Sequence, residues 1–159
     1  MTDPNRTQAF ENFDQVIEQV QQRLNDGYTQ MGKWNLAQCC EHLSEWMRYA
    51  MEGYPKSPLP IRVMVGLLKA TMGRRLLANA LKDGFKDGLP TIPQSVAAPD
   101  KSTDADAVRR LADMIERLKS YRGPIQPSPL YGPLEHDELM QLHLVHCAHH
   151  LKFLKPKSA

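Results

Sequence analysis

Apolar residues recur along this chain at alternating steps of three and four, which is the spacing of one face of an α-helix. The first such run contains Phe10, Phe13, Ile17, Val20 and Leu24. It stops at residues 25–27, where Gly27 suits the left-handed conformation that ends many helices. These positions predict an amphipathic helix that packs one side on a core.

A second helix is predicted from about Trp34 to Gly53, with Asn35 as its amino-terminal cap. Its apolar face comprises Leu36, Cys39, Cys40, Leu43, Trp46, Met47 and Ala50. Three prolines then fall within residues 54–60. Because proline does not fit a helix interior, we read this segment as a connector.

The third predicted helix, residues 61–82, is apolar on more than one side. One side carries Ile61, Val65, Leu68, Met72 and Leu76, and off it lie Val63, Leu67, Leu77 and Leu81. We interpret it as a helix buried on more than one side, inside the bundle. A subunit contact is the main alternative. A third alternative, suggested by its five basic residues, is a helix that lies on a membrane surface.

Residues 83–102 form a long irregular segment with two Asp-Gly turns and three prolines. Segments of this length are binding loops or lids in some proteins and plain surface excursions in others, and both interpretations stay open. A fourth helix follows, capped by Thr103 or Asp104. Its inward residues are Val108, Leu111, Ile115 and Leu118.

A connector rich in proline and glycine, residues 123–133, leads to a last helix from about Glu135 to Leu154, which Pro156 ends. No segment shows the alternation of a clear strand. We therefore predict an all-α fold in which the first, second, fourth and last helices form a four-helix bundle. Residues 61–82 add a further helix, and proline-rich connectors join the elements.

Composition narrows the class of protein. A chain of 159 residues that is 42% apolar and 24% charged is predicted to be a single globular domain, residues 1–159. A net charge of +2 predicts no nucleic-acid partner and no membrane partner. The longest apolar stretch is interrupted by Arg62, Lys69 and Arg74, so it falls short of the roughly 20 residues of a membrane span.

The first ten residues lack the apolar run of a secretory signal. The chain has three cysteines, and two of them are adjacent, which does not make a disulfide framework. We therefore expect a reduced, cytoplasmic protein.

The candidate chemistry lies in the histidines, of which the last helix carries five out of six. His146 and His150 are one turn apart and point within about 40° of each other, on the side that also carries the buried leucines. Such a pair presents two imidazoles to one metal, although imidazole binds Zn, Ni, Cu and Fe alike. The alternative is ordinary packing, and for His136 that is the preferred interpretation.

The sixth histidine, His42, lies at the edge of the apolar face of the second helix. It would complete a three-histidine site if it turned inward. Alone, a histidine in this position is more often partly buried and satisfied by a neighbour.

Two segments resemble the DinB-like superfamily. The sequence GKWNLAQCCEHLSEW, residues 32–46, is similar to that superfamily's second helix, and SPLYGPLEHDELMQLHLVHCAHHLKFL, residues 128–154, is similar to its closing helix. The second segment most resembles a branch of uncharacterised bacterial proteins with the pattern H-x-x-H-H-L-x-x-F. The sequence PTIPQS, residues 90–95, resembles that branch's proline-bearing loop.

The resemblance implies a DinB-like four-helix bundle in which His42, His146 and His150 hold one divalent metal, Zn or Ni. His149 would then be an outer or structural residue. The resemblance also implies a homodimer. Glu135 stands where many members have a Thr or Ser cap.

The same resemblance implies an enzyme in which the metal activates a thiol or a water towards a small electrophile, as a thiol transferase or hydrolase does. Its partners would be a small-molecule substrate and a low-molecular-weight thiol. Glu45, one turn beyond His42, is a candidate base or outer acceptor, with a solvated carboxylate as the alternative.

Two alternatives remain. In the first, the chain is a metal-binding stress or interaction protein without turnover, and Cys39 closes the site as a fourth ligand; Cys147 points away from His146 and is a weaker candidate. In the second, the histidines bind nothing.

Overall fold

A computed structural model describes residues 9–157 of the chain, so residues 1–8, on which the expectation about a secretory signal largely rests, lie outside the described part. The described chain is mostly helical. Its elements are α1 (Phe13–Asp26), β1 (Tyr28–Gln30), α2 (Leu36–Glu52), α3 (Leu59–Asp83), a 3-10 turn η1 (Pro93–Ser95), α4 (Asp104–Ser120), α5 (His136–Leu151) and β2 (Leu154–Pro156). All five predicted helices are therefore present.

Helices α1, α2 and α4 begin where the sequence supplies capping side chains, whereas α3 begins after Pro58 without one. Asn35 accepts a hydrogen bond from the backbone N–H of Gln38, and the Gln38 side chain accepts one from the Asn35 N–H, a reciprocal pair that closes the start of α2. The side chains of Asn12 and Thr103 cap α1 and α4, and each accepts a hydrogen bond from the backbone N–H three residues later. At α5, the Glu135 N–H donates to the Glu138 carboxylate, so the start of this helix also has a partner.

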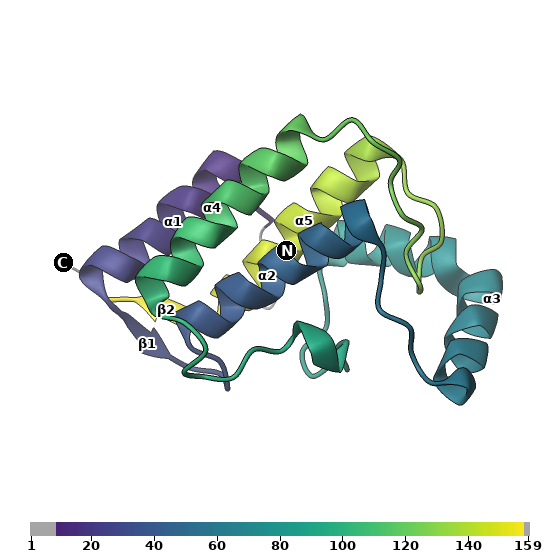
Figure 1. Ribbon diagram of the computed structural model, residues 1–159, viewed down its shortest axis with the longest axis horizontal. Helices are drawn as coiled ribbons and strands as arrows, with labels where there is room; N and C mark the ends of the chain where they lie inside the picture. Colours follow the sequence, from purple (N-terminus) through teal and green to yellow (C-terminus); the bar gives the residue numbers. More distant parts are fainter. Residues whose placement is uncertain (1–8, 158–159) are drawn as a thin grey trace, which may run out of the picture.

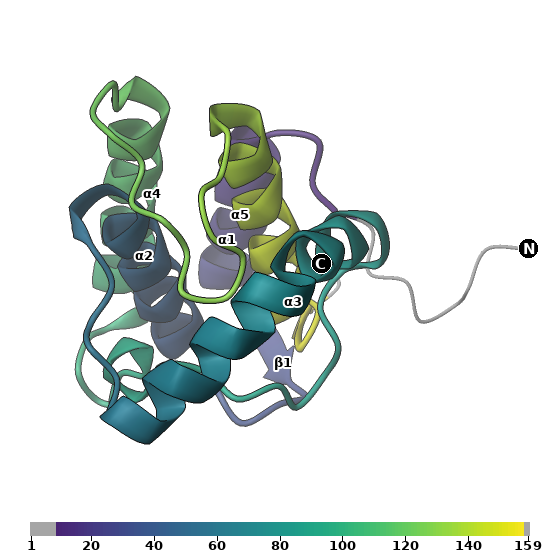
Figure 2. The ribbon, with the colours of Figure 1, turned by 90° about the vertical axis from the view of Figure 1, so that its right-hand side faces the viewer.

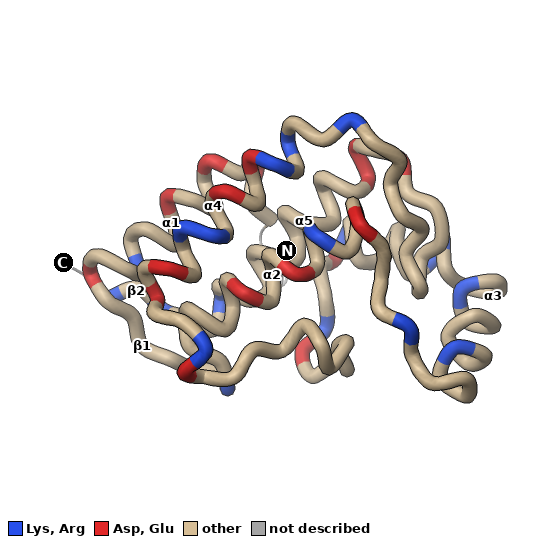
Figure 3. The backbone as a smooth tube through the Cα atoms, viewed as in Figure 1, with Lys and Arg blue, Asp and Glu red and all other residues tan. Residues whose placement is uncertain are grey.

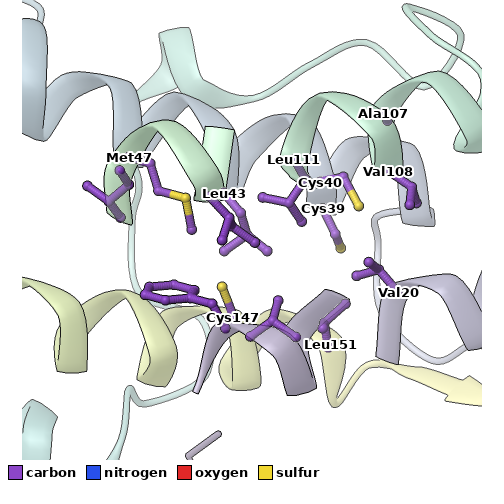
Figure 4. Packing of buried hydrophobic residues seen from close by; sticks show 14 of the residues in the cluster. Val20, Cys39, Cys40, Leu43, Met47, Ala107, Val108, Leu111, Cys147 and Leu151 are labelled. Carbon is purple, nitrogen blue, oxygen red and sulfur yellow. The ribbon is translucent and has the colours of Figure 1, made fainter. Parts of the chain in front are cut away.

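Helices α1, α2, α4 and α5 lie around one apolar core (Figures 1 and 2). Figure 4 shows how Leu43, Met47 and Leu111 from α2 and α4 face Cys147 and Leu151 from α5. All three cysteines are buried in this core and unpaired. The four helices are therefore held together by burial of their apolar faces in one shared core.

A two-stranded antiparallel sheet joins the segment after α1 to the segment after α5, with Tyr28 opposite Pro156. Our prediction of a chain without strands, and of a last helix reaching Leu154, is wrong at this point. Arg23 explains the change, because its buried guanidinium donates to the carbonyl oxygens of Leu151 and Leu154 at 3.3 and 2.7 Å. These bonds satisfy the carbonyls where α5 stops and hold the extended residues beside β1.

Helix α3 departs from the prediction of a helix buried on several sides. Its buried residues are Gly73, Leu77 and Ala80, all in its second half. The first half extends past the other helices (Figures 1 and 2). Its large apolar side chains are exposed, so the described part of the chain gives this half of the helix too few neighbours to cover it. No helix in the described chain has the length and apolar character to cross a membrane.

Candidate metal centre

Three histidine side chains from two helices meet at one point. His42 comes from the middle of α2, and His146 and His150 come from successive turns of α5. The Nε2 atom of His146 lies 3.2 Å from His42 Nε2 and 3.0 Å from His150 Nε2. All three ligand atoms lie within 4.8 Å of one another. The structure therefore brings together the three residues that the resemblance implies as ligands.

The spacing of these nitrogens suits a metal ion. A Zn–N bond of about 2.0–2.1 Å places two ligand nitrogens about 3.4 Å apart at a tetrahedral angle and about 3.0 Å apart at a right angle. The two measured separations fall close to or within this range. Two of the three pairs thus have the spacing of ligands on a shared ion, and the third pair lies within 4.8 Å.

Hydrogen bonding alone does not satisfy the three rings. The Nδ1 atom of His42 lies 3.1 Å from the carbonyl oxygen of Ser95. Because a carbonyl only accepts, Nδ1 carries the proton of the neutral ring, and Nε2 presents a lone pair. His146 Nε2 can make a linear hydrogen bond to at most one of its two histidine neighbours. A cation would use all three lone pairs at once.

Burial keeps the rings neutral. Loss of contact with water lowers the pKa of His42 to about 4. The same loss, together with repulsion from His42, His149 and Lys152, lowers the pKa of His150 to about 2. The pKa of His146 is also well below its usual range, chiefly because of burial. Neutral imidazole is the form that binds metals, so protons compete little for this site near neutral pH.

Aromatic side chains form the surroundings of the cluster. Trp34 stacks on His150 with ring centres 5.1 Å apart, and Trp46 and Phe85 present their rings edgewise to His146 at 5.7 and 5.5 Å. The Trp46 Nε1 atom is buried without a hydrogen-bond partner among the described residues. The histidines therefore lie in a weakly polar, partly buried environment that contains an unused donor, the Trp46 N–H.

The irregular segment between α3 and α4 covers one side of this site. It contributes Phe85 at its start and the Ser95 carbonyl in η1. Sequence reasoning missed both as site residues, because a backbone carbonyl has no signature in the sequence. The only signal was the resemblance of residues 90–95 to a loop of the DinB-like branch.

Glu45 is not part of the three-histidine cluster. Its carboxylate pairs with Arg48 at 2.5 Å on the same helix, and Ser95 rather than Glu45 accepts from His42. Neither Cys39 nor Cys147 joins the cluster among the described residues. Burial raises the pKa of each of these two thiols to about 12, so both are protonated core residues.

The remaining histidines of α5 are separate from the three-histidine cluster. His149 packs between Phe85 and Phe153, with Nδ1 3.8 Å from an Asp87 carboxylate oxygen. His143 is buried, and His136 has a half-exposed side chain. The outer, structural role that the resemblance implies for His149 is consistent with these contacts.

Geometry and chemistry together describe a mostly helical protein with a three-histidine cluster of metal-ligand spacing. A family model matches residues 2–157, and its description reads "Protein of unknown function (DUF1569)". The chain belongs to this family. No curated protein and no solved structure matches it.

Proposed function

We propose that His42, His146 and His150 bind one divalent metal ion, Zn or Ni, and that the protein is a metal-dependent enzyme acting on a small electrophile. The convergence of three Nε2 atoms in a buried, uncharged setting carries the proposal. A divalent ion held by three neutral imidazoles keeps its full charge and an open position, so it lowers the pKa of a bound water towards 7 or holds a thiol as its thiolate.

The chain's own residues would prepare this site. The Ser95 carbonyl fixes the tautomer of His42, and Trp34 fixes the plane of the His150 ring. Trp34, Trp46 and Phe85 would limit the access of bulk water to the ligands. The free N–H of Trp46 is a donor for an oxygen or sulfur atom of a bound small molecule.

The reaction type and the wider family are part of the same proposal. We place the chain in the DinB-like superfamily as a four-helix bundle, supported by the two resembling segments and by the shared core of α1, α2, α4 and α5. The implied activity is thiol transfer or hydrolysis on a small molecule in the cytoplasm, without nucleic-acid or membrane partners. The three unpaired cysteines support a reducing compartment.

A second function, metal binding without turnover, is favoured by one observation. The only carboxylate that the sequence suggested as a base, Glu45, is paired with Arg48. In the described chain, no acidic side chain joins the three histidines. A site without a base and with aromatic walls also suits a metal-binding stress or interaction protein.

Metal content tests the binding proposal. Untagged protein should contain about one Zn or Ni per chain by inductively coupled plasma mass spectrometry, a ratio expected from three ligands and one ion. His146→Ala should abolish stoichiometric binding while leaving the helical circular dichroism nearly unchanged. His136→Ala, a half-exposed histidine of the same helix, is the matched control and should bind like the parent. Equal binding by the parent and by His146→Ala would contradict the proposal.

Turnover tests the choice between the two functions. Metal-loaded parent and His146→Ala should be compared in the presence of a low-molecular-weight thiol and a chromogenic small electrophile, and then with a chromogenic ester in water. Activity that requires both the metal and His146 supports the enzyme. A fully loaded protein without activity towards either class supports metal binding without turnover.

A further inference from the structure

The first half of α3 carries large apolar side chains that the other described residues, 9–157, leave exposed. We call six of them the outer face of α3. Their exposed fractions are Ile61 45%, Val63 63%, Met64 64%, Leu67 66%, Leu68 37% and Met72 40%. Such exposure of large aliphatic groups in one helix is unusual, because burying each would be favourable by about 1.5–3 kcal/mol.

The helix turns its other side towards the body of the protein. At Gly73 an added Cβ atom would lie 3.0 Å from the carbonyl oxygen of Leu130, and at Gly132 it would lie 3.8 Å from the Cδ atom of Lys69. Lys69 therefore runs along the connector before α5. At about 100° per residue, Arg62 lies within about 20° of Lys69, and both lie roughly 140° from the middle of the outer face.

The size of the outer face is that of half an interface. Six large side chains with these exposed fractions present on the order of 600 Å² of mostly apolar surface, which equals the largest patch on a typical monomer. Two such faces in contact bury about 1,200 Å², the lower end of specific protein interfaces. A second copy of the same face therefore supplies an area of the right order for an interface.

We propose that the outer face of α3 binds the outer face of α3 in a second copy of this chain, with the two helices antiparallel across a two-fold axis near Leu67. The face can pair with itself, because all six side chains are apolar and Leu67 lies near the middle of the run from Ile61 to Met72. The proposal does not depend on the metal site.

Charge favours a second copy over a lipid surface. The chain has no Asp or Glu between residues 53 and 82, and Figure 3 shows Lys and Arg alone along the first half of α3. Helices that bind membranes place basic residues where they reach the headgroups beside the apolar face. Here Arg62 and Lys69 are on the far side, and Arg74 pairs with Glu138 at 2.5 Å. Arg75 is on the side of the outer face, but it lies beyond Met72, at the end of that face. In an antiparallel pair, the same placement keeps Arg62 and Lys69 away from the contact.

Sedimentation velocity between roughly 1 and 100 µM tests the proposal, a range that brackets the affinity of an interface this small. The parent should form a dimer, with and without a chelator. Leu67→Glu should raise the dimer Kd at least about tenfold, because a carboxylate would be buried without a partner. Leu67→Met should still dimerise. Leu89→Glu, at an equally exposed leucine outside α3, is the matched control and should also dimerise.

Circular dichroism reports whether each variant folds. If Leu67→Glu does not fold, Val63→Lys is a second variant that places a charge on the outer face. A parent that stays monomeric at the highest concentration overturns the proposal. So does a dimer that neither outer-face variant weakens. Vesicles of phosphatidylcholine and phosphatidylserine form a separate arm. Parent protein that sediments with them, when Leu67→Glu does not, assigns the face to a membrane and also overturns the proposal.

Discussion

At the scale of single residues, neighbouring groups orient the rings of two candidate ligands, His42 and His150. The ring of His42 is bonded to the Ser95 carbonyl and lies 4.8 Å from the ring of Trp34, which also stacks on His150. Ligands fixed in this way lose little conformational freedom when a metal binds. The site therefore needs few rearrangements to accept an ion.

His143 provides a prediction about pH. It is buried, its Nε2 has no hydrogen-bond partner among the described residues, and burial lowers its pKa to about 4. Since this pKa is below the value of about 6.5 in an unfolded chain, the unfolded state binds more protons between these values. The stabilising contribution is complete above pH 6.5 and is lost as the pH falls towards 4.

Substitution of His143 should therefore reduce the acid sensitivity of the protein. Between pH 7 and pH 5, the parent should lose about 2 kcal/mol of unfolding free energy through the titration of His143. The His143→Leu variant should lack this part of the loss. Urea denaturation of both proteins at the two pH values, with a chelator present, measures the difference. Equal losses in the parent and the variant would show that His143 does not titrate in this way.

The ligands could be found from the sequence, whereas their surroundings could not. His146 and His150 are one helical turn apart, so the helix alone fixes their relative direction. The acceptor of His42 is a backbone carbonyl in an irregular segment, and its position depends on the whole path from α3 to α4. Contacts of that kind follow from tertiary structure rather than from residue type.

At the scale of elements, apolar periodicity located the helices because each of the four core helices buries one continuous face. It failed for β1 and β2, which are three residues each and too short for an alternating pattern. It also misjudged α3, because the sequence shows that aliphatic residues need cover but does not show whether the cover comes from the same chain.

The cap of α2 is predicted to matter for stability. Asn35 accepts from Gln38 N–H at 2.8 Å, and its Nδ2 donates to the carbonyl of Pro99, which ties the helix to the segment that covers the histidines. Asn35→Ala should lower the unfolding free energy by about 1–2 kcal/mol. Chemical denaturation measures this change. Asn79→Ala, at an exposed position inside α3, should change stability by less than about 0.5 kcal/mol, and an equal effect of the two substitutions would argue against the cap.

At the scale of the whole molecule, the candidate ligands connect α2 with α5 across the edge of the core. An ion bound there should stabilise the folded chain, because an unfolded chain does not hold the three rings together. At a free metal concentration about 100 times the Kd, the gain should be about 2.7 kcal/mol. Thermal unfolding with and without added Zn²⁺ measures it as a rise in Tm.

His146→Ala is the matched control for this stabilisation. Its Tm should be insensitive to the same Zn²⁺ concentration, because two of the three ligands remain and bind far more weakly. A rise in Tm equal to that of the parent would place the stabilising ion elsewhere in the protein.

The pairing of β1 with β2 has a consequence for synthesis on the ribosome. Tyr28 pairs with Pro156, and the guanidinium of Arg23 donates to the carbonyls of Leu151 and Leu154. Helix α1 and strand β1 therefore cannot make these contacts until residues 151–156 have been synthesised. Until those residues leave the exit tunnel, the apolar faces of α1 and α2 lack α5 as a neighbour. Both the sheet and the histidine cluster therefore form only after α5 and β2 have left the tunnel, so the core and the candidate metal ligands are completed together.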